Sequence, residues 1–313
     1  MSVVENKKGV NLMTIPHYTG FFNHKSSISF ENQTFEGEVL HVFNQTINIV
    51  LKKQFPNLLT IGGMQILGNP QSLAFSNFHV IQSQLKVGDR CLLQGTEQLI
   101  FSDFQCHLKL IAEDEGERTL SIIPRPSFLE KIQLLKLALL GKNTSQTHPS
   151  FAPFYQQLYR ESEQLNTALL KGDREVVQEK VRRMIGLGIG LTPSGDDFLT
   201  GMLLVLQNEK ELGHFLQQSV LQELTGTNVI SQHQLYFACQ GVAKPSLLVV
   251  VQGIFDETSE LAKLQQAITE TLAIGSTSGH DLLSGVVQGF DLLNRKGEEK
   301  NEFSRKSNSK SLH

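Results

Sequence analysis

The sequence predicts an α+β fold, in which a β-rich, barrel- or sandwich-like N-terminal domain precedes a helical C-terminal domain. Between about residues 27 and 120, short apolar runs alternate with polar residues and are broken by Asn, Gln and Gly, which is typical of half-buried strands. After Pro124 and Pro126, apolar residues recur at intervals of three and four, which is helical spacing. The helical half also contains an internal helix–loop–helix repeat.

The composition along the chain predicts four segments. We expect an N-terminal arm at 1–26, a β-rich domain at 27–123, a helical domain at 124–294, and a disordered tail at 295–313 that is charged and Ser-rich. A chain of 313 residues with 40% hydrophobic residues can bury one large core or two ordinary ones.

The expected elements follow these periodicities. The clearest strands are built around Phe35, Val39 and Val42, around Ile47, Ile49 and Leu51, and at 58–61, 78–81, 90–93, 98–101 and 107–112, in an order that the pattern leaves open. A capping box at Ser127 and Glu130 begins the helical half, Asp173 and Ser231 are predicted N-caps, and Gln234 completes a second box. Further helices are expected at 151–170, 174–185, 196–207, 212–224, 232–240, 259–272 and 280–293.

Charge and cysteine content exclude several classes of protein. The net charge of −3 gives no electrostatic reason to expect nucleic acid or an anionic membrane as a partner. Three widely spaced cysteines, Cys91, Cys106 and Cys239, argue against a disulfide framework or a zinc site. The N-terminus has no signal-like apolar run, and the apolar stretches at 198–206 and 247–251 are too short to cross a bilayer. We therefore expect a cytoplasmic protein.

The segment at 186–201, GLGIGLTPSGDDFLTG, carries the strongest functional signal. A predicted helix enters it and another leaves it, and four glycines fall within ten residues. Such a loop lets a ligand approach the backbone, and unpaired amides at the next helix N-terminus favour an anion. The candidate anion-binding residues here are Gly188, Gly190, Thr192, Ser194, Gly195 and Asp196.

A second loop repeats the first. Residues 278–285 align without a gap on residues 194–201, giving S-G-x-D-[FL]-L-[ST]-G with a spacing of 84 residues. The repeat predicts two similar units about a pseudo-twofold axis, with both loops facing one cleft and with Asp197 close to Asp281. Asp197, Asp281 and His280 are the candidate catalytic residues, and the second anion-binding set is Thr277, Ser278 and Gly279.

Plainer interpretations of the loops remain open. Ser194 and Ser278 could be ordinary N-caps with favourable first-turn acids, and Gly201 and Gly285 more simply allow close helix packing. A phosphate-binding P-loop is disfavoured because Asp196 follows the glycine where a lysine belongs, and a dinucleotide fingerprint lacks its third glycine. No cofactor is required by the pattern, although Asp196, Asp197 and Asp281 could hold Mg²⁺.

At these loops the sequence resembles a known family, the AllH-like subunit of oxamate carbamoyltransferase. The resemblance rests on GLGIGLTPSGDDFLTG and GSTSGHDLLSG, with weaker support from residues 41–44 and 227–231, and it spans roughly residues 27–293. It implies a subunit of a complex with two other subunits, acting in anaerobic use of allantoin nitrogen. The implied reaction converts oxalurate and phosphate to oxamate and carbamoyl phosphate, all small anions.

Two alternatives are kept beside this function. The chain could be a non-catalytic subunit that binds a small anion or supports assembly, or it could be a Mg²⁺-dependent hydrolase with paired aspartates. The pattern does not decide whether this chain carries the catalysis, which ureido or carbamoyl acid it uses, whether it needs a metal, or how many copies assemble.

Overall fold

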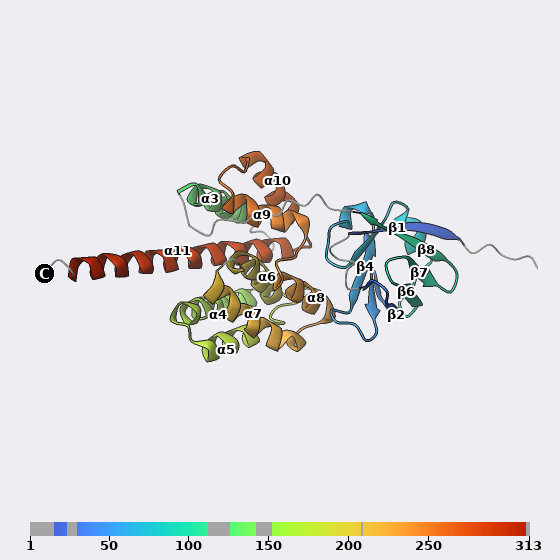
Figure 1. The fold of residues 1–313 in the computed structure, drawn as a ribbon, viewed down its shortest axis with the longest axis horizontal. Coiled ribbons are helices and arrows are strands. Elements are labelled where there is room, and N and C mark those ends of the chain that lie inside the picture. Colours follow the sequence, from blue (N-terminus) through green and yellow to red (C-terminus); the bar gives the residue numbers. More distant parts are fainter. Residues whose placement is uncertain (1–15, 24–29, 112–125, 142–151, 208, 311–313) are drawn as a thin grey trace, which may run out of the picture. The chain divides into compact units, whose positions relative to one another are not determined.

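The computed structural model describes two compact units, Met1–Asp114 and Glu115–His313, which Figure 1 draws as a strand-rich and a helical part. The expected domain boundary after residue 123 and most of the expected N-terminal arm lie outside the described residues. The structure describes residues 16–23, 30–111, 126–141, 152–207 and 209–310.

The N-terminal unit is a closed β-barrel, so the barrel alternative of the predicted fold is confirmed. Its strand order is β1-β5-β4-β3-β2-β6-β7-β8. The parallel pairs are β1 with β8, which closes the barrel, and β4 with β5. The strands are β1 (His17–Asn23), β2 (Thr34–Val42), β3 (Thr46–Leu51), β4 (Leu58–Gly62), β5 (Ser72–Phe75), β6 (Arg90–Gln94), β7 (Gln98–Phe101) and β8 (Gln105–Ile111).

Two details of the barrel differ from the sequence prediction. β1 lies inside the segment expected to be an arm, because Phe22 is fully buried and places this strand in the barrel core. Residues expected as a strand at 78–81 instead belong to a short helix, α2 (Phe78–Gln82). Phe78 and Ile81 are buried while Val80 is 47% exposed, which is the three-residue spacing of a helix face and not strand alternation.

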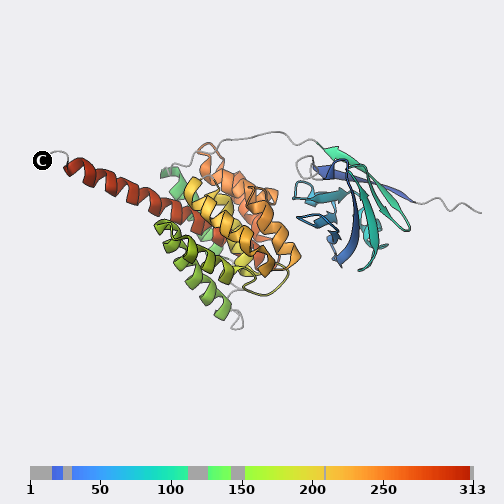
Figure 2. The same ribbon diagram turned by 60° about the horizontal axis from the view of Figure 1, so that its bottom comes forward.

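The C-terminal unit is built around two helices, α6 (Ser194–Leu206) and α11 (Ser278–Lys310), which pack against each other. Figures 1 and 2 show α11 running through the unit and continuing past the other helices. No described helix combines the length and apolarity needed to span a membrane. The other helices are α3 (Pro126–Gly141), α4 (Ala152–Lys171), α5 (Arg174–Met184), α7 (Lys210–Glu223), α8 (Val229–Ala238), α9 (Pro245–Phe255) and α10 (Leu261–Leu272), with short 3₁₀ turns η2 (Met64–Ile66) and η3 (Leu224–Gly226).

The helix caps confirm one prediction and correct another. The Asp173 side chain accepts a hydrogen bond from the Val176 amide and caps α5, as predicted. Ser231 is not a cap, because α8 begins earlier and its cap is Asn228, which accepts from the amides of Ile230 and Ser231. Gln234 is therefore not part of a capping box. At the start of the helical unit, α3 begins at Pro126, before the expected cap.

The largest difference concerns the end of the chain. α11 continues to Lys310, so the structure places helix across most of the segment expected to be a disordered tail. Two facts explain this. Lys296 Nζ lies 2.8 Å from Glu209 Oε1 and 2.7 Å from Glu211 Oε2, which ties this part of α11 to the start of α7. A helix that is already nucleated also extends at little further cost in free energy.

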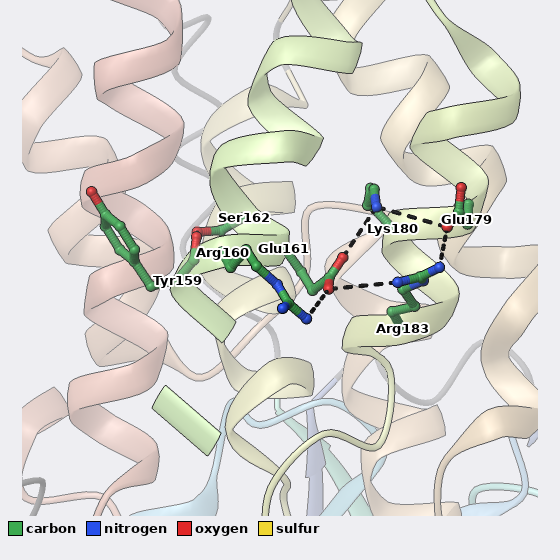
Figure 3. A network of polar contacts seen from close by, with 7 residues as sticks. All are labelled: Tyr159, Arg160, Glu161, Ser162, Glu179, Lys180 and Arg183. Atoms are coloured by element: carbon green, nitrogen blue, oxygen red, sulfur yellow. Dashed lines mark hydrogen bonds and ion pairs between the residues drawn. The ribbon is translucent and has the colours of Figure 1, made fainter. Parts of the chain in front are cut away.

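A buried carboxylate joins α4 to α5 (Figure 3). Glu161 is 1% exposed and lies 3.3 Å from Lys180 Nζ, 3.1 Å from Arg160 Nη2 and 3.8 Å from Arg183 Nη1. Burial alone raises the pKa of Glu161, but the hydrogen bonds and charges of these cations outweigh it and hold the pKa below its ordinary value. The charges of Lys180 and Arg183 on α5 are therefore partly neutralised by the buried Glu161.

Candidate functional site

The two repeated loops meet in the structure. Thr192 Oγ1, before α6, lies 2.7 Å from Ser278 Oγ, at the start of α11. Both residues are half-buried, and the first loop reaches solvent, since Ile189 is 56% exposed. The two loops therefore meet, while the predicted cleft that both would face stays a prediction.

The helices that follow the loops cross through reciprocal glycine contacts. A Cβ added at Gly201 of α6 would collide with the carbonyl oxygen of Leu282, and a Cβ added at Gly285 of α11 would collide with that of Phe198. Each residue of one contact is 84 positions from its counterpart in the other, which is the spacing of the repeat. Contacts that map onto themselves in this way define a pseudo-twofold axis between the helices. They also confirm that Gly201 and Gly285 serve close packing.

In each loop, a glycine with positive φ lies against the serine that begins the next helix. Gly188 has φ +120° and approaches the Ser194 amide so closely that a Cβ would lie 2.7 Å from its nitrogen. Gly275 has φ +59°, and a Cβ added there would lie 3.3 Å from Ser278 Oγ. L-residues rarely adopt either conformation, so the loop geometry itself requires these glycines.

Some of the amides predicted to bind an anion are already used within the protein. The Gly195 amide donates to Leu187 O at 2.8 Å, and the Gly279 amide donates to Ile274 O at 3.0 Å. The amides of Asp196 and Asp197 donate to Pro193 O. The predicted anion seat therefore depends on the hydroxyl groups and on the loop backbone ahead of Pro193, where Gly188 and Gly190 lie.

Both carboxylate oxygens of Asp196 are hydrogen-bonded within the protein, which corrects its prediction as an anion- or metal-binding residue. It is fully buried, and its Oδ1 accepts from the Gly186 amide at 2.8 Å while its Oδ2 accepts from Thr227 Oγ1 at 2.5 Å. Burial raises the pKa of Asp196, and the hydrogen bonds from Thr227 and Gly186 oppose that rise. Both oxygens hold the first loop and the start of α8 against α6.

Asp197 points toward the junction of the loops and has one oxygen without a partner. The residue is fully buried; its Oδ1 accepts from Gln234 Nε2 at 2.8 Å, and its buried Oδ2 has no hydrogen-bond partner among the described residues. Burial, together with the charge of Asp281, raises the pKa of Asp197 to about 7. The side chains of Gln234, Ser278 and Thr192 lower this pKa and partly oppose the rise.

Asp281 is the counterpart of Asp197 on α11. It is 1% exposed, its Oδ2 lies 3.4 Å from the Tyr155 hydroxyl, and its Oδ1 lies 3.9 Å from His280 Nδ1. Its charge raises the pKa of Asp197, so the two carboxylates lie within electrostatic reach of each other. His280 is half-buried beside Asp281, and Ser284 Oγ donates to the His280 carbonyl.

Several residues of this region were missed from the sequence. Gln234, Thr227 and Tyr155 come from α8, the segment before it, and α4, and no local pattern marks them as neighbours of the loop acids. Lys244, at the N-cap position of α9, is a fourth. It keeps contact with solvent, yet the surrounding protein lowers the pKa of its ammonium by desolvation, an effect that the charge of Asp197 opposes.

Other features of the described residues lie away from the loops. Within the described parts of the chain, no group of three or more His, Cys, Asp or Glu side chains could hold a metal ion. With Asp196 engaged, Asp197 and Asp281 are the predicted metal ligands that remain. A cavity of about 280 Å³ between α6, α7 and α8 and one of about 350 Å³ on the barrel are lined by other residues.

The comparison with known families agrees with this geometry. Residues 184–290 match the family described as oxamate carbamoyltransferase subunit AllH. The match begins at the end of α5 and ends within α11, so it contains both loops and the helix crossing. No solved structure matches the chain. The match confirms the resemblance over residues 184–290, where this chain is similar to the AllH subunit of oxamate carbamoyltransferase.

Proposed function

We propose that this chain, with two other subunits in the cytoplasm, converts oxalurate and phosphate to oxamate and carbamoyl phosphate in allantoin degradation, and that the junction of its two loops binds the reactants. The observation that carries the proposal is the 2.7 Å contact between Thr192 and Ser278, because it brings the two related loops to one place inside the segment that matches the AllH family. Two loops suit a reaction with two anionic reactants.

Each loop would hold one reactant. The backbone around Gly188 and Gly190, with Thr192 and Ser194, offers hydrogen-bond donors to one anion, and Thr277 and Ser278 offer hydroxyl groups to the other. Lys244 adds a positive charge beside Asp197. Holding both reactants in one orientation lowers the entropic barrier to their reaction.

The two aspartates would orient the nitrogen atoms of the substrate. In the proposed step, a phosphate oxygen attacks the carbamoyl carbon, the bond from that carbon to the oxamate nitrogen breaks, and the nitrogen receives the proton that phosphate gives up. Asp197 Oδ2 is free to accept an N–H from the ureido group. Hydrogen-bond donors of the loops would stabilise the oxyanion of the tetrahedral intermediate, and His280 beside Asp281 is the proposed proton donor.

The test is made on the assembled complex. The chain is co-expressed with the products of neighbouring genes, and carbamoyl phosphate formation from oxalurate and phosphate is measured. The double variant Asp197→Asn/Asp281→Asn should lose turnover while the chain stays folded. Asp173→Asn is the matched control, because asparagine caps a helix as well as aspartate does.

The outcomes separate the candidate functions. Turnover by the wild-type complex that disappears in the double variant supports catalysis at the loop junction. Full turnover in the double variant would instead leave this chain a non-catalytic subunit of the complex. A wild-type complex that makes no carbamoyl phosphate but hydrolyses an amide only when Mg²⁺ is added would favour the hydrolase.

A further inference from the structure

The side chain of Gln234 has a defined orientation at the loop junction. Its Nε2 lies 2.8 Å from Asp197 Oδ1 and 3.1 Å from Thr200 Oγ1. Thr200 donates its own hydroxyl proton to the carbonyl of Asp196, so toward Gln234 it can only accept. Both partners are acceptors, and the two N–H groups of the amide therefore point at them.

This arrangement decides which oxygen of Asp197 remains for a ligand. Because Oδ1 is held by Gln234, the buried Oδ2 is the oxygen left without a partner, beside the hydroxyl groups of Thr192 and Ser278. A buried carboxylate oxygen without a donor is costly, and a ligand N–H would remove that cost.

In the second half of the repeat, a different kind of side chain contacts the aspartate. Asp281, the counterpart of Asp197, is approached by a phenol, the Tyr155 hydroxyl at 3.4 Å, and the donor comes from α4 instead of α8. The backbone is duplicated, but the side chains that orient the two carboxylates are not. The halves are therefore built to receive different groups.

We infer that Gln234 is a positioning residue that aims Asp197 Oδ2 at the amide group of oxamate or of the oxamate portion of oxalurate, and so makes this half of the site select an amide over a carboxylate. The inference rests on the proposed function. An amide N–H can donate to Oδ2, whereas a carboxylate in the same place would face it with like charge.

The experiment compares oxamate with oxalate, in which a second carboxylate replaces the amide. Binding of each to the assembled complex is measured by calorimetry near pH 8. The wild type should prefer oxamate by roughly 10- to 100-fold, the range expected for a hydrogen bond to a charged group. Gln234→Leu should reduce that preference to about threefold or less. The ratio of two affinities does not depend on the fraction of folded protein.

Two further variants distinguish positioning from general damage. Gln217→Leu is the matched control, since Gln217 is also half-buried and donates one hydrogen bond, to the Cys239 carbonyl, away from the loops. It should keep the preference for oxamate. Gln234→Glu should lose the preference at pH 8, where the new carboxylate repels Asp197, and regain part of it at lower pH, where a protonated Glu can donate to Oδ1.

A Gln234→Leu complex that prefers oxamate as strongly as the wild type would overturn this inference and leave the proposed function intact. If the wild-type complex turns over oxalurate but binds oxamate no better than oxalate, the inference also fails alone. If the wild type neither binds oxamate nor forms carbamoyl phosphate, the proposed function fails, and the inference fails with it.

Discussion

The hydroxyl oxygens of Thr192 and Ser278 lie 2.7 Å apart although 86 residues separate them in the chain. Each belongs to one copy of the repeated loop, so this hydrogen bond links the two halves of the site. Both hydroxyl groups act on the buried Asp197, whose pKa the charge of Asp281 also raises, so groups from both loops come together at one junction.

We expect the hydrogen bond between these hydroxyl groups to couple the two loops energetically. Thr192→Val and Ser278→Ala should each lower turnover of the assembled complex, and the double variant should lose less than the sum of the two effects. A coupling of about 1 kcal/mol is expected for one hydrogen bond of this kind. Strict additivity in the double-mutant cycle would mean that the bond is not made in solution.

Adjacent aspartates should respond differently to the same substitution. In Asp196→Asn, an NH2 group replaces one of the two oxygens that accept hydrogen bonds from the Gly186 amide and the Thr227 hydroxyl. One of these bonds is then lost, and the free energy of unfolding should fall by about 2 to 3 kcal/mol. Asp197→Asn should lower turnover with little loss of stability, since its amide oxygen can still accept from Gln234. Urea unfolding and turnover, measured on both variants, test this. Equal loss of stability in both would contradict the assignment of Asp196 alone to the scaffold.

The pKa of Asp197 predicts how stability depends on pH. Burial raises it from 3.8 to about 7, so the folded chain holds this proton where the unfolded chain has released it. The stability that this proton contributes is complete below pH 3.8 and is lost as the pH rises through 7. Asn does not titrate, so Asp197→Asn keeps its stability as the pH rises. Its free energy of unfolding should exceed that of the wild type by about 2 to 4 kcal/mol at pH 8 but not at pH 4.

Chemical denaturation of the two proteins across this pH range is the measurement. Asp281→Asn provides a second check, because the charge of Asp281 raises the pKa of Asp197. Without that charge, the folded-state pKa should be lower, so the loss of stability should end at a lower pH and be smaller. A constant difference between Asp197→Asn and the wild type from pH 4 to pH 8 would mean that this carboxyl keeps an ordinary pKa.

The glycines at the helix crossing should not tolerate alanine. Gly201→Ala gains up to about 1 kcal/mol from helix propensity, but its methyl group meets the Leu282 carbonyl, and we expect a net loss of about 2 to 4 kcal/mol. Gly297→Ala in α11 is the matched control, since nothing lies within 4 Å of its added Cβ, and it should be neutral or slightly stabilising. Thermal unfolding distinguishes these results. A neutral Gly201→Ala would contradict the close crossing.

The repeat in the sequence predicted that the two loops meet, but not how their acids divide their roles. Asp196 and Asp197 are adjacent and chemically identical, and only their partners separate a scaffold residue from one that faces the loop junction. Those partners, Thr227 and Gln234, are distant in sequence and leave no local signal. Sequence spacing carries information about one helix face, whereas contacts between helices are set by tertiary packing.

The same limit explains the errors in the fold. Alternation identified most barrel strands because each exposes one face, but the four fully buried residues of β5 give no alternating pattern. α9 was not predicted because its Leu- and Val-rich core carries no polar face that would reveal a helical period. The end of α11 was expected to be disordered because the ion pairs of Lys296 involve acids far back in the chain.

The crossing of α6 and α11 has a mechanical consequence. Where Gly201 and Gly285 meet, main chain touches main chain, and no layer of side chains is left that could compress or change rotamer. A displacement of one helix must then be transmitted to the other instead of being absorbed between them. The two loops should therefore keep a constant separation, and under the proposed function the adjustment to each reactant would fall to the hydroxyl, amide and carboxyl groups of their side chains.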